Sequence, residues 1–160
     1  GADCALFAAG VPLIMRDRGD RIERLAAAEA ARLSGRRILV FKPGFGIGTA
    51  WAYGRMAADP TSYVSAAEAE ARLAVWREDA AAPLESLTYN NMEGVAFAKF
   101  LALPAMYAEL RERFDVTARM SGSGSASFLV LGADTDAGPI MDCVKKLWGP
   151  SAFVLTTEMV

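Results

Sequence analysis

The stretch ARMSGSGSASF, residues 118–128, decides the fold because it joins two apolar, strand-like runs through a Ser-Gly turn. Elsewhere a Ser-Gly run would indicate a flexible linker. Here the apolar runs flank it so closely that we expect a short, ordered turn. Downstream, a helix over 137–148 closed by Gly149-Pro150 and a final strand in 151–160 complete a β, turn, β, α, β order.

Upstream of this stretch, helices are expected between strands. Residues 36–41, RRILVF, read as a buried strand ended by Pro43-Gly44, and Thr49, an N-cap type of residue, begins a predicted helix to Met56. Residues 65–80 carry the capping-box spacing of Ser65 and Glu68. We also expect a hairpin over 12–25, a short helix or variable loop over 26–35, and helices over 90–101 and 104–114. This order predicts an α+β fold with helices packed on one face of a mostly antiparallel sheet.

Composition excludes several classes of function. The chain has 160 residues, 53% of them hydrophobic and 22% charged, which excludes a disordered chain. No apolar run is long enough for a membrane span, and 17 basic against 19 acidic residues predict no nucleic-acid partner and no membrane partner. Histidine is absent, which excludes Ser-His-Asp and Cys-His catalysis, and the two cysteines form no CxxC. We expect a cytoplasmic protein without a metal site.

Asp3 lies among small and apolar residues in GADCALF, residues 1–7. A carboxylate in such surroundings needs a cation or hydrogen-bond donors, and such positions are often functional. The alternative is a helix cap or a terminal Asp in solvent.

A second candidate is PGFGIGT, residues 43–49, between the predicted strand and helix. Its glycine spacing is not GxGxxG and no Lys follows, so neither a dinucleotide fingerprint nor a Walker A loop is indicated. Two interpretations remain: a flexible connection, or a backbone that approaches a ligand, with Tyr53 one helical turn after Thr49.

The Ser-Gly turn is the third candidate. Successive amides in such a turn can form an anion-binding nest, aided by the hydroxyls of Ser121, Ser123 and Ser125, and phosphate is the usual guest. A hairpin loop without a ligand is the alternative.

Together these segments resemble the C-terminal portion of the GHMP family of small-molecule kinases. Within that family they are most similar to the enzymes acting on 4-diphosphocytidyl-2-C-methyl-D-erythritol in non-mevalonate isoprenoid biosynthesis. The resemblance is carried, in order, by GADCALF (1–7), RDRGDRIERL (16–25), VFKPGFGIGTAWAY (40–53), YNNME (89–93) and ARMSGSGSASF (118–128).

The resemblance implies an ATP-dependent phosphorylation of the 2-hydroxyl of this cytidine diphosphate alcohol. It implies that Asp3 is the catalytic base and that Tyr53 packs on the cytosine, with Thr49 and Ala50 beside it. The turn, with Ser121, Gly122, Ser123, Gly124 and Ser125, would lie along the diphosphate. Phosphoryl transfer needs mainly positioning and charge stabilisation, which these residues and ATP with Mg²⁺ would supply without histidine.

The family's ATP-binding loop and its catalytic Lys would lie upstream of Gly1. The resemblance therefore implies that residues 1–35 are a remnant of the N-terminal half, that 36–160 form the substrate-side domain, and that the missing N-terminal half is a partner. We expect these 160 residues alone not to turn over. The alternatives are another GHMP small-molecule kinase, a non-catalytic ligand-binding or interaction module of the same fold, and an α+β domain without a small-molecule site.

Overall fold

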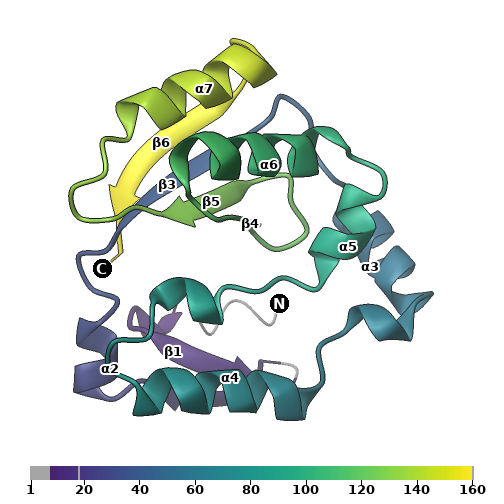
Figure 1. Ribbon diagram of the computed structural model, residues 1–160. Helices are drawn as coiled ribbons and strands as arrows, with labels where there is room; N and C mark the ends of the chain where they lie inside the picture. The colour runs from purple at the N-terminus through teal and green to yellow at the C-terminus, as the bar shows by residue number, and fades with distance from the viewer. Residues whose placement is uncertain (1–7, 18, 160) are drawn as a thin grey trace. The chain divides into compact units, whose positions relative to one another are not determined.

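The computed structural model describes residues 8–17 and 19–159, which form two compact units (Figure 1). The first contains the described residues up to Arg36 together with Glu158 and Met159, and the second spans Arg37–Thr157. In the first unit β1 (Leu13–Arg16) pairs antiparallel with β2 (Arg21–Arg24). The predicted hairpin is therefore confirmed, and the Ala-rich segment that follows it is a short helix, α2 (Ala27–Ala31).

The second unit is built on a sheet with the strand order β4-β5-β3-β6. Its strands are β3 (Arg37–Lys42), β4 (Ala118–Met120), β5 (Ser127–Val130) and β6 (Phe153–Glu158). Strand β5 is antiparallel to both of its neighbours, β3 and β4. Met120 pairs with Ser127, so the Ser-Gly stretch is the tight connection between β4 and β5.

Two helices, α6 (Ala102–Phe114) and α7 (Gly138–Trp148), cover one face of this sheet (Figure 1). Alternate residues of each strand point to this face, as the two-residue period of a strand requires. The buried residues of this core are Leu39, Phe41, Met106, Leu110, Ala118, Leu129, Leu131, Ala137, Ile140, Cys143 and Val144. The predicted α+β fold with helices on one face of the sheet is confirmed.

A second core lies where the β4–β5 connection meets α3 (Thr49–Ala57) and α5 (Met92–Phe97). Its buried members are Ile47, Ala52, Met56, Met92, Ala96, Leu103 and Met120. Between α3 and α5 the chain forms η1 (Pro60–Ser62), α4 (Ala66–Glu78) and η2 (Leu84–Leu87). The Ser65 hydroxyl accepts the amide of Glu68 at 3.1 Å, which confirms Ser65 as the N-cap of α4.

One predicted cap is wrong. Thr49 was expected to cap α3, but Gly48 is the N-cap and Thr49 is the first helical residue. The Thr49 hydroxyl instead bonds to Ser123, far along the chain.

Asp3 lies outside the described residues. Among those that are described, no helix is both long enough and apolar enough to cross a membrane.

Candidate functional site

The two glycine-bearing segments that the sequence singled out meet in the second unit. The Thr49 and Ser123 hydroxyls lie 2.9 Å apart, and the Ser125 hydroxyl donates to the Phe45 carbonyl. A Cβ at Gly124 would lie 3.1 Å from the Ile47 side chain. The strand-to-helix segment and the Ser-Gly turn therefore form one surface, although about 75 residues separate them.

The start of α5 holds the Ser-Gly turn in place. The Asn90 amide nitrogen donates to the Met120 carbonyl at 2.7 Å and to the Gly122 carbonyl at 2.8 Å. Its oxygen accepts the Met92 amide, so Asn90 also supports the beginning of the helix. A Glu93 oxygen accepts the Met120 amide at 2.8 Å, and its second oxygen lies 3.5 Å from the Arg119 guanidinium.

Part of the turn's hydrogen-bonding capacity is used within the protein. The Ser121 amide donates to Ala126 and the Gly124 amide donates to Ser121. Ser125 is fully buried, so its hydroxyl faces the protein rather than a ligand. Among the described residues, the amides of Gly122 and Ser123 have no protein acceptor. Together with the exposed Ser121 and Thr49 hydroxyls, they form a smaller set of donors than the sequence predicted.

An exposed aromatic ring follows on the same side of α3. Residues four apart on a helix lie above one another, so Tyr53 projects from the same face as Thr49. Tyr53 is 56% exposed, whereas Ala52 and Met56 point into the second core. Ala50 is exposed as well. The ring is therefore available to stack on a planar group near the turn.

Behind the turn, Tyr107 of α6 supports β5 from within. Its hydroxyl donates to the buried Ser127 hydroxyl at 2.7 Å, and Ser127 in turn donates to the Ser125 carbonyl at 3.3 Å. Burial raises the pKa of the Tyr107 phenol well above its ordinary value, so the group stays protonated as a donor. These hydroxyls therefore act as supports for the turn.

The site thus offers amide and hydroxyl donors beside an exposed ring. Such donors suit an anion with several oxygen atoms, because each oxygen can accept more than one hydrogen bond. Ser123 has a double function, since its hydroxyl links the turn to Thr49 while its amide remains open.

No protein-family model matches the chain, and no curated protein matches it in sequence. The chain is similar in structure to a crystal structure of 4-(cytidine 5'-diphospho)-2C-methyl-D-erythritol kinase, with a TM-score of 0.66 and 27% identity. The chain has the fold of the C-terminal portion of a GHMP-family kinase. The match covers 100% of this chain but 55% of the kinase, so the chain spans about half the length of that protein.

The structural match does not test the roles expected of Thr49, Ala50, Tyr53 and the turn, which stay predictions.

Two structural residues were missed by reasoning from the sequence. Asn90 and Glu93 form hydrogen bonds that hold the turn, whereas the sequence indicates the YNNME segment only as part of the resemblance. The signal available was the pair of Asn residues directly before a helix, which is typical of side chains that bond to nearby backbone.

Proposed function

We propose that this chain is the substrate-side part of a kinase that transfers the γ-phosphate of ATP to the 2-hydroxyl of 4-diphosphocytidyl-2-C-methyl-D-erythritol, a step of non-mevalonate isoprenoid synthesis. The observation that carries the proposal is the structural match along the whole chain to a kinase of that name. The junction of Thr49 with Ser123 supports it, because it brings a ring-bearing helix to the turn.

In this proposal the turn binds the diphosphate of the substrate. The open amides of Gly122 and Ser123 would donate to its oxygens, with the Thr49 and Ser121 hydroxyls beside them. Amides fixed by Asn90 and by internal hydrogen bonds need no reorganisation when the anion arrives, which is the condition for effective electrostatic stabilisation.

The cytosine would stack on Tyr53, and Ala50 would leave room beside it because it carries only a methyl group. Stacking of a base on an aromatic ring is worth about 1–3 kcal/mol. A ring that is 56% exposed can still cover one face of a base. This contact would select a cytidyl substrate over smaller alcohols.

The role proposed for Asp3 comes from the resemblance alone. As the 2-hydroxyl oxygen attacks the γ-phosphorus, the bond to the ADP oxygen breaks and Asp3 accepts the hydroxyl proton. Magnesium would accompany ATP and neutralise charge on its phosphates. The described residues contain no group of three His, Cys, Asp or Glu side chains that could hold a metal ion.

Isothermal titration calorimetry of this chain with the cytidine diphosphate alcohol tests the proposal. We expect Tyr53→Ala to weaken binding about 5- to 150-fold, because it removes the stacking surface. Tyr53→Phe should bind like the unchanged chain, since the ring is kept.

Tyr63→Ala is the matched control, because Tyr63 is another largely exposed tyrosine, at the end of η1. Equal affinity of the Tyr53→Ala and Tyr63→Ala variants would contradict the assignment of the base site. Absence of any binding to the unchanged chain would contradict substrate binding by this part and favour a non-catalytic module.

A further inference from the structure

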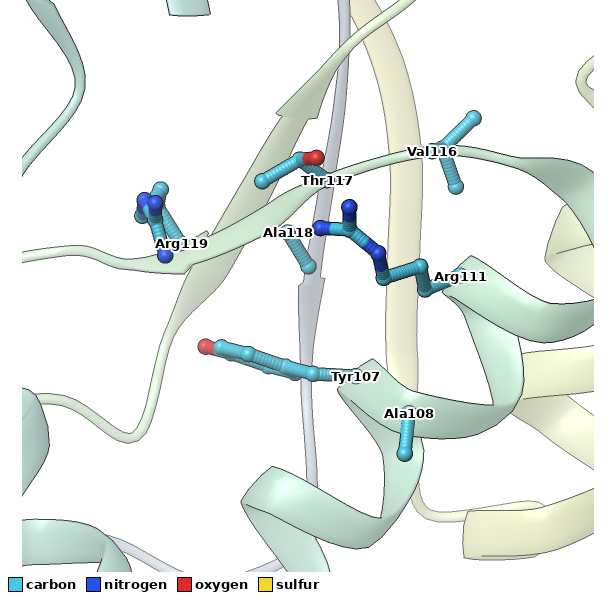
Figure 2. A pocket seen from close by; sticks show the side chains of 7 residues that line it. All are labelled: Tyr107, Ala108, Arg111, Val116, Thr117, Ala118 and Arg119. Carbon is cyan, nitrogen blue, oxygen red and sulfur yellow. The ribbon is translucent and has the colours of Figure 1, made fainter.

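A separate pocket lies at the free edge of β4, where the end of α6 and the segment leading into β4 come together. Its volume is about 170 Å³, and its lining residues are Tyr107, Ala108, Arg111, Val116, Thr117, Ala118 and Arg119. None of the Ser-Gly turn residues lines it. Figure 2 shows Arg111 and Tyr107 reaching from α6 toward β4, with Arg119 on the side to which the Tyr107 hydroxyl points.

The pocket has two guanidinium groups and little negative charge to balance them. Within the part of the chain that the structure describes, Arg111 forms no ion pair. Arg119 donates its Nε to the Thr88 carbonyl and lies 3.5 Å from Glu93. Because a guanidinium carries five N–H donors, Arg119 retains donors beyond those two contacts.

A backbone amide adds a donor of a different kind. The Met120 amide donates to Glu93, so it points away from β5. Neighbouring strand residues direct their N–H groups to opposite edges, and Ala118 therefore points its amide to the same free edge as Met120. No acceptor for the Ala118 amide is found among the described residues.

The size and the donors of the pocket select the class of ligand. A volume of about 170 Å³ gives room for one compact group. An added peptide strand is disfavoured, because Glu93 and Asn90 already occupy the outward amide and carbonyl of Met120. Planar guanidinium groups with an adjacent amide match the oxygens of a compact oxyanion.

We propose that this pocket binds a phosphate or carboxylate group between Arg111, Arg119 and the Ala118 amide. Thr117 is another of its lining residues, and the Tyr107 ring and Ala108 form its apolar wall. Arg111 supplies the principal attraction, since its guanidinium is not engaged by a carboxylate of the described chain.

Titration of the ¹⁵N-labelled chain with inorganic phosphate, followed by amide and arginine side-chain NMR, tests the proposal. We expect saturable shifts of the Ala118 amide and the Arg111 Nε–H. Arg111→Gln should weaken phosphate binding at this position about tenfold, as loss of a charge-assisted hydrogen bond requires. A parallel titration with acetate distinguishes carboxylate from phosphate as the preferred oxyanion, and either preference supports the proposal.

Lys146→Gln is the control, because it removes one positive charge from the last turn of another helix, α7. It should leave the shifts at Ala118 unchanged. Equal shifts with sodium chloride of matched ionic strength would overturn the proposal. So would shifts confined to Gly122 and Ser123, which belong to the turn, or an Arg111→Gln variant that binds phosphate as tightly as the unchanged chain.

Discussion

Two glycines of the Ser-Gly turn have different reasons to be glycine. Gly122 and Gly124 have positive φ angles of 54° and 79°, which residues with a side chain rarely adopt. A Cβ at Gly122 would meet nothing within 4 Å, whereas one at Gly124 would lie 2.6 Å from the Met120 sulfur. At position 122, glycine is therefore favoured by the backbone conformation alone. At position 124, it is favoured by the backbone conformation and also by the close packing of Met120.

Alanine at these two positions should therefore have unequal effects. Gly122→Ala should lower the free energy of unfolding by about 1 kcal/mol, the cost of a left-handed residue. Gly124→Ala should lower it by about 2–4 kcal/mol, because the buried Met120 side chain must also move. Urea denaturation of both variants measures the difference. Equal decreases in the free energy of unfolding for the two variants would contradict this, because they would mean that the Met120 side chain moves aside with no loss of stability.

At the scale of elements, α5 closes the free edge of β4 near the turn. Asn90 and Glu93 occupy the outward backbone groups of Met120, as a neighbouring strand would. Burial raises the pKa of the Glu93 carboxyl above its ordinary 4.5, although the Met120 amide and Arg119 act in the opposite direction. The contact between α5 and β4 is therefore sensitive to pH.

The sign of this dependence follows from proton binding. The folded chain binds the Glu93 proton more tightly than the unfolded chain, so Glu93 contributes less to the free energy of unfolding as pH rises from 4.5 through its raised pKa. Glu93→Gln does not titrate and can still accept the Met120 amide. Urea denaturation at about pH 4 and about pH 7 should show this variant gaining stability relative to the unchanged chain at the higher pH.

Glu109→Gln is the control for this measurement, because Glu109 forms an exposed pair with Arg113 on α6. A relative stability of Glu93→Gln that stays constant or falls between the two pH values would contradict the raised pKa of Glu93.

At the scale of the whole molecule, the two compact units differ in what stabilises them. The unit spanning Arg37–Thr157 has two cores, one between the sheet and helices α6 and α7 and one beside the Ser-Gly turn. In the smaller unit, the described residues Leu13, Ile14 and Met15 of β1 are half-buried, and α2 has no fully buried residue. Apolar burial is the main stabilising contribution in folded domains, so the larger unit should dominate the unfolding transition.

Leu110 of α6 tests this dominance. It is fully buried in the sheet core, and Leu110→Ala should lower the free energy of unfolding by about 2–5 kcal/mol, through lost burial and the cavity left behind. Leu101→Ala, at a position 69% exposed, should change it by less than about 0.5 kcal/mol. Thermal and urea unfolding of the pair gives the comparison. If Leu110→Ala left the midpoint of the cooperative unfolding transition unchanged, the core around Leu110 would not be the one that dominates stability.

Element order and type could be read from local patterns. The strand at Arg37–Lys42, the cap at Ser65 and the Gly149 end of α7 depend on residues close in sequence, and their chemistry is the same wherever the segments lie. Thr49 shows where local patterns fail to predict a residue's role. Its residue type favours an N-cap position, but its hydroxyl forms a hydrogen bond with Ser123, 74 residues away.

By itself, then, the sequence determined the α+β order of elements, the tight Ser-Gly turn and the resemblance to a kinase, because periodicity, caps and turn residues act over a few positions. Only the tertiary structure decided which groups of the turn remain open. The Ser125 hydroxyl donates to the Phe45 carbonyl, and Asn90 donates to two carbonyls of the turn. The Gly122 and Ser123 amides are among those without an acceptor in the described chain, because packing decides which partners distant in sequence are within reach.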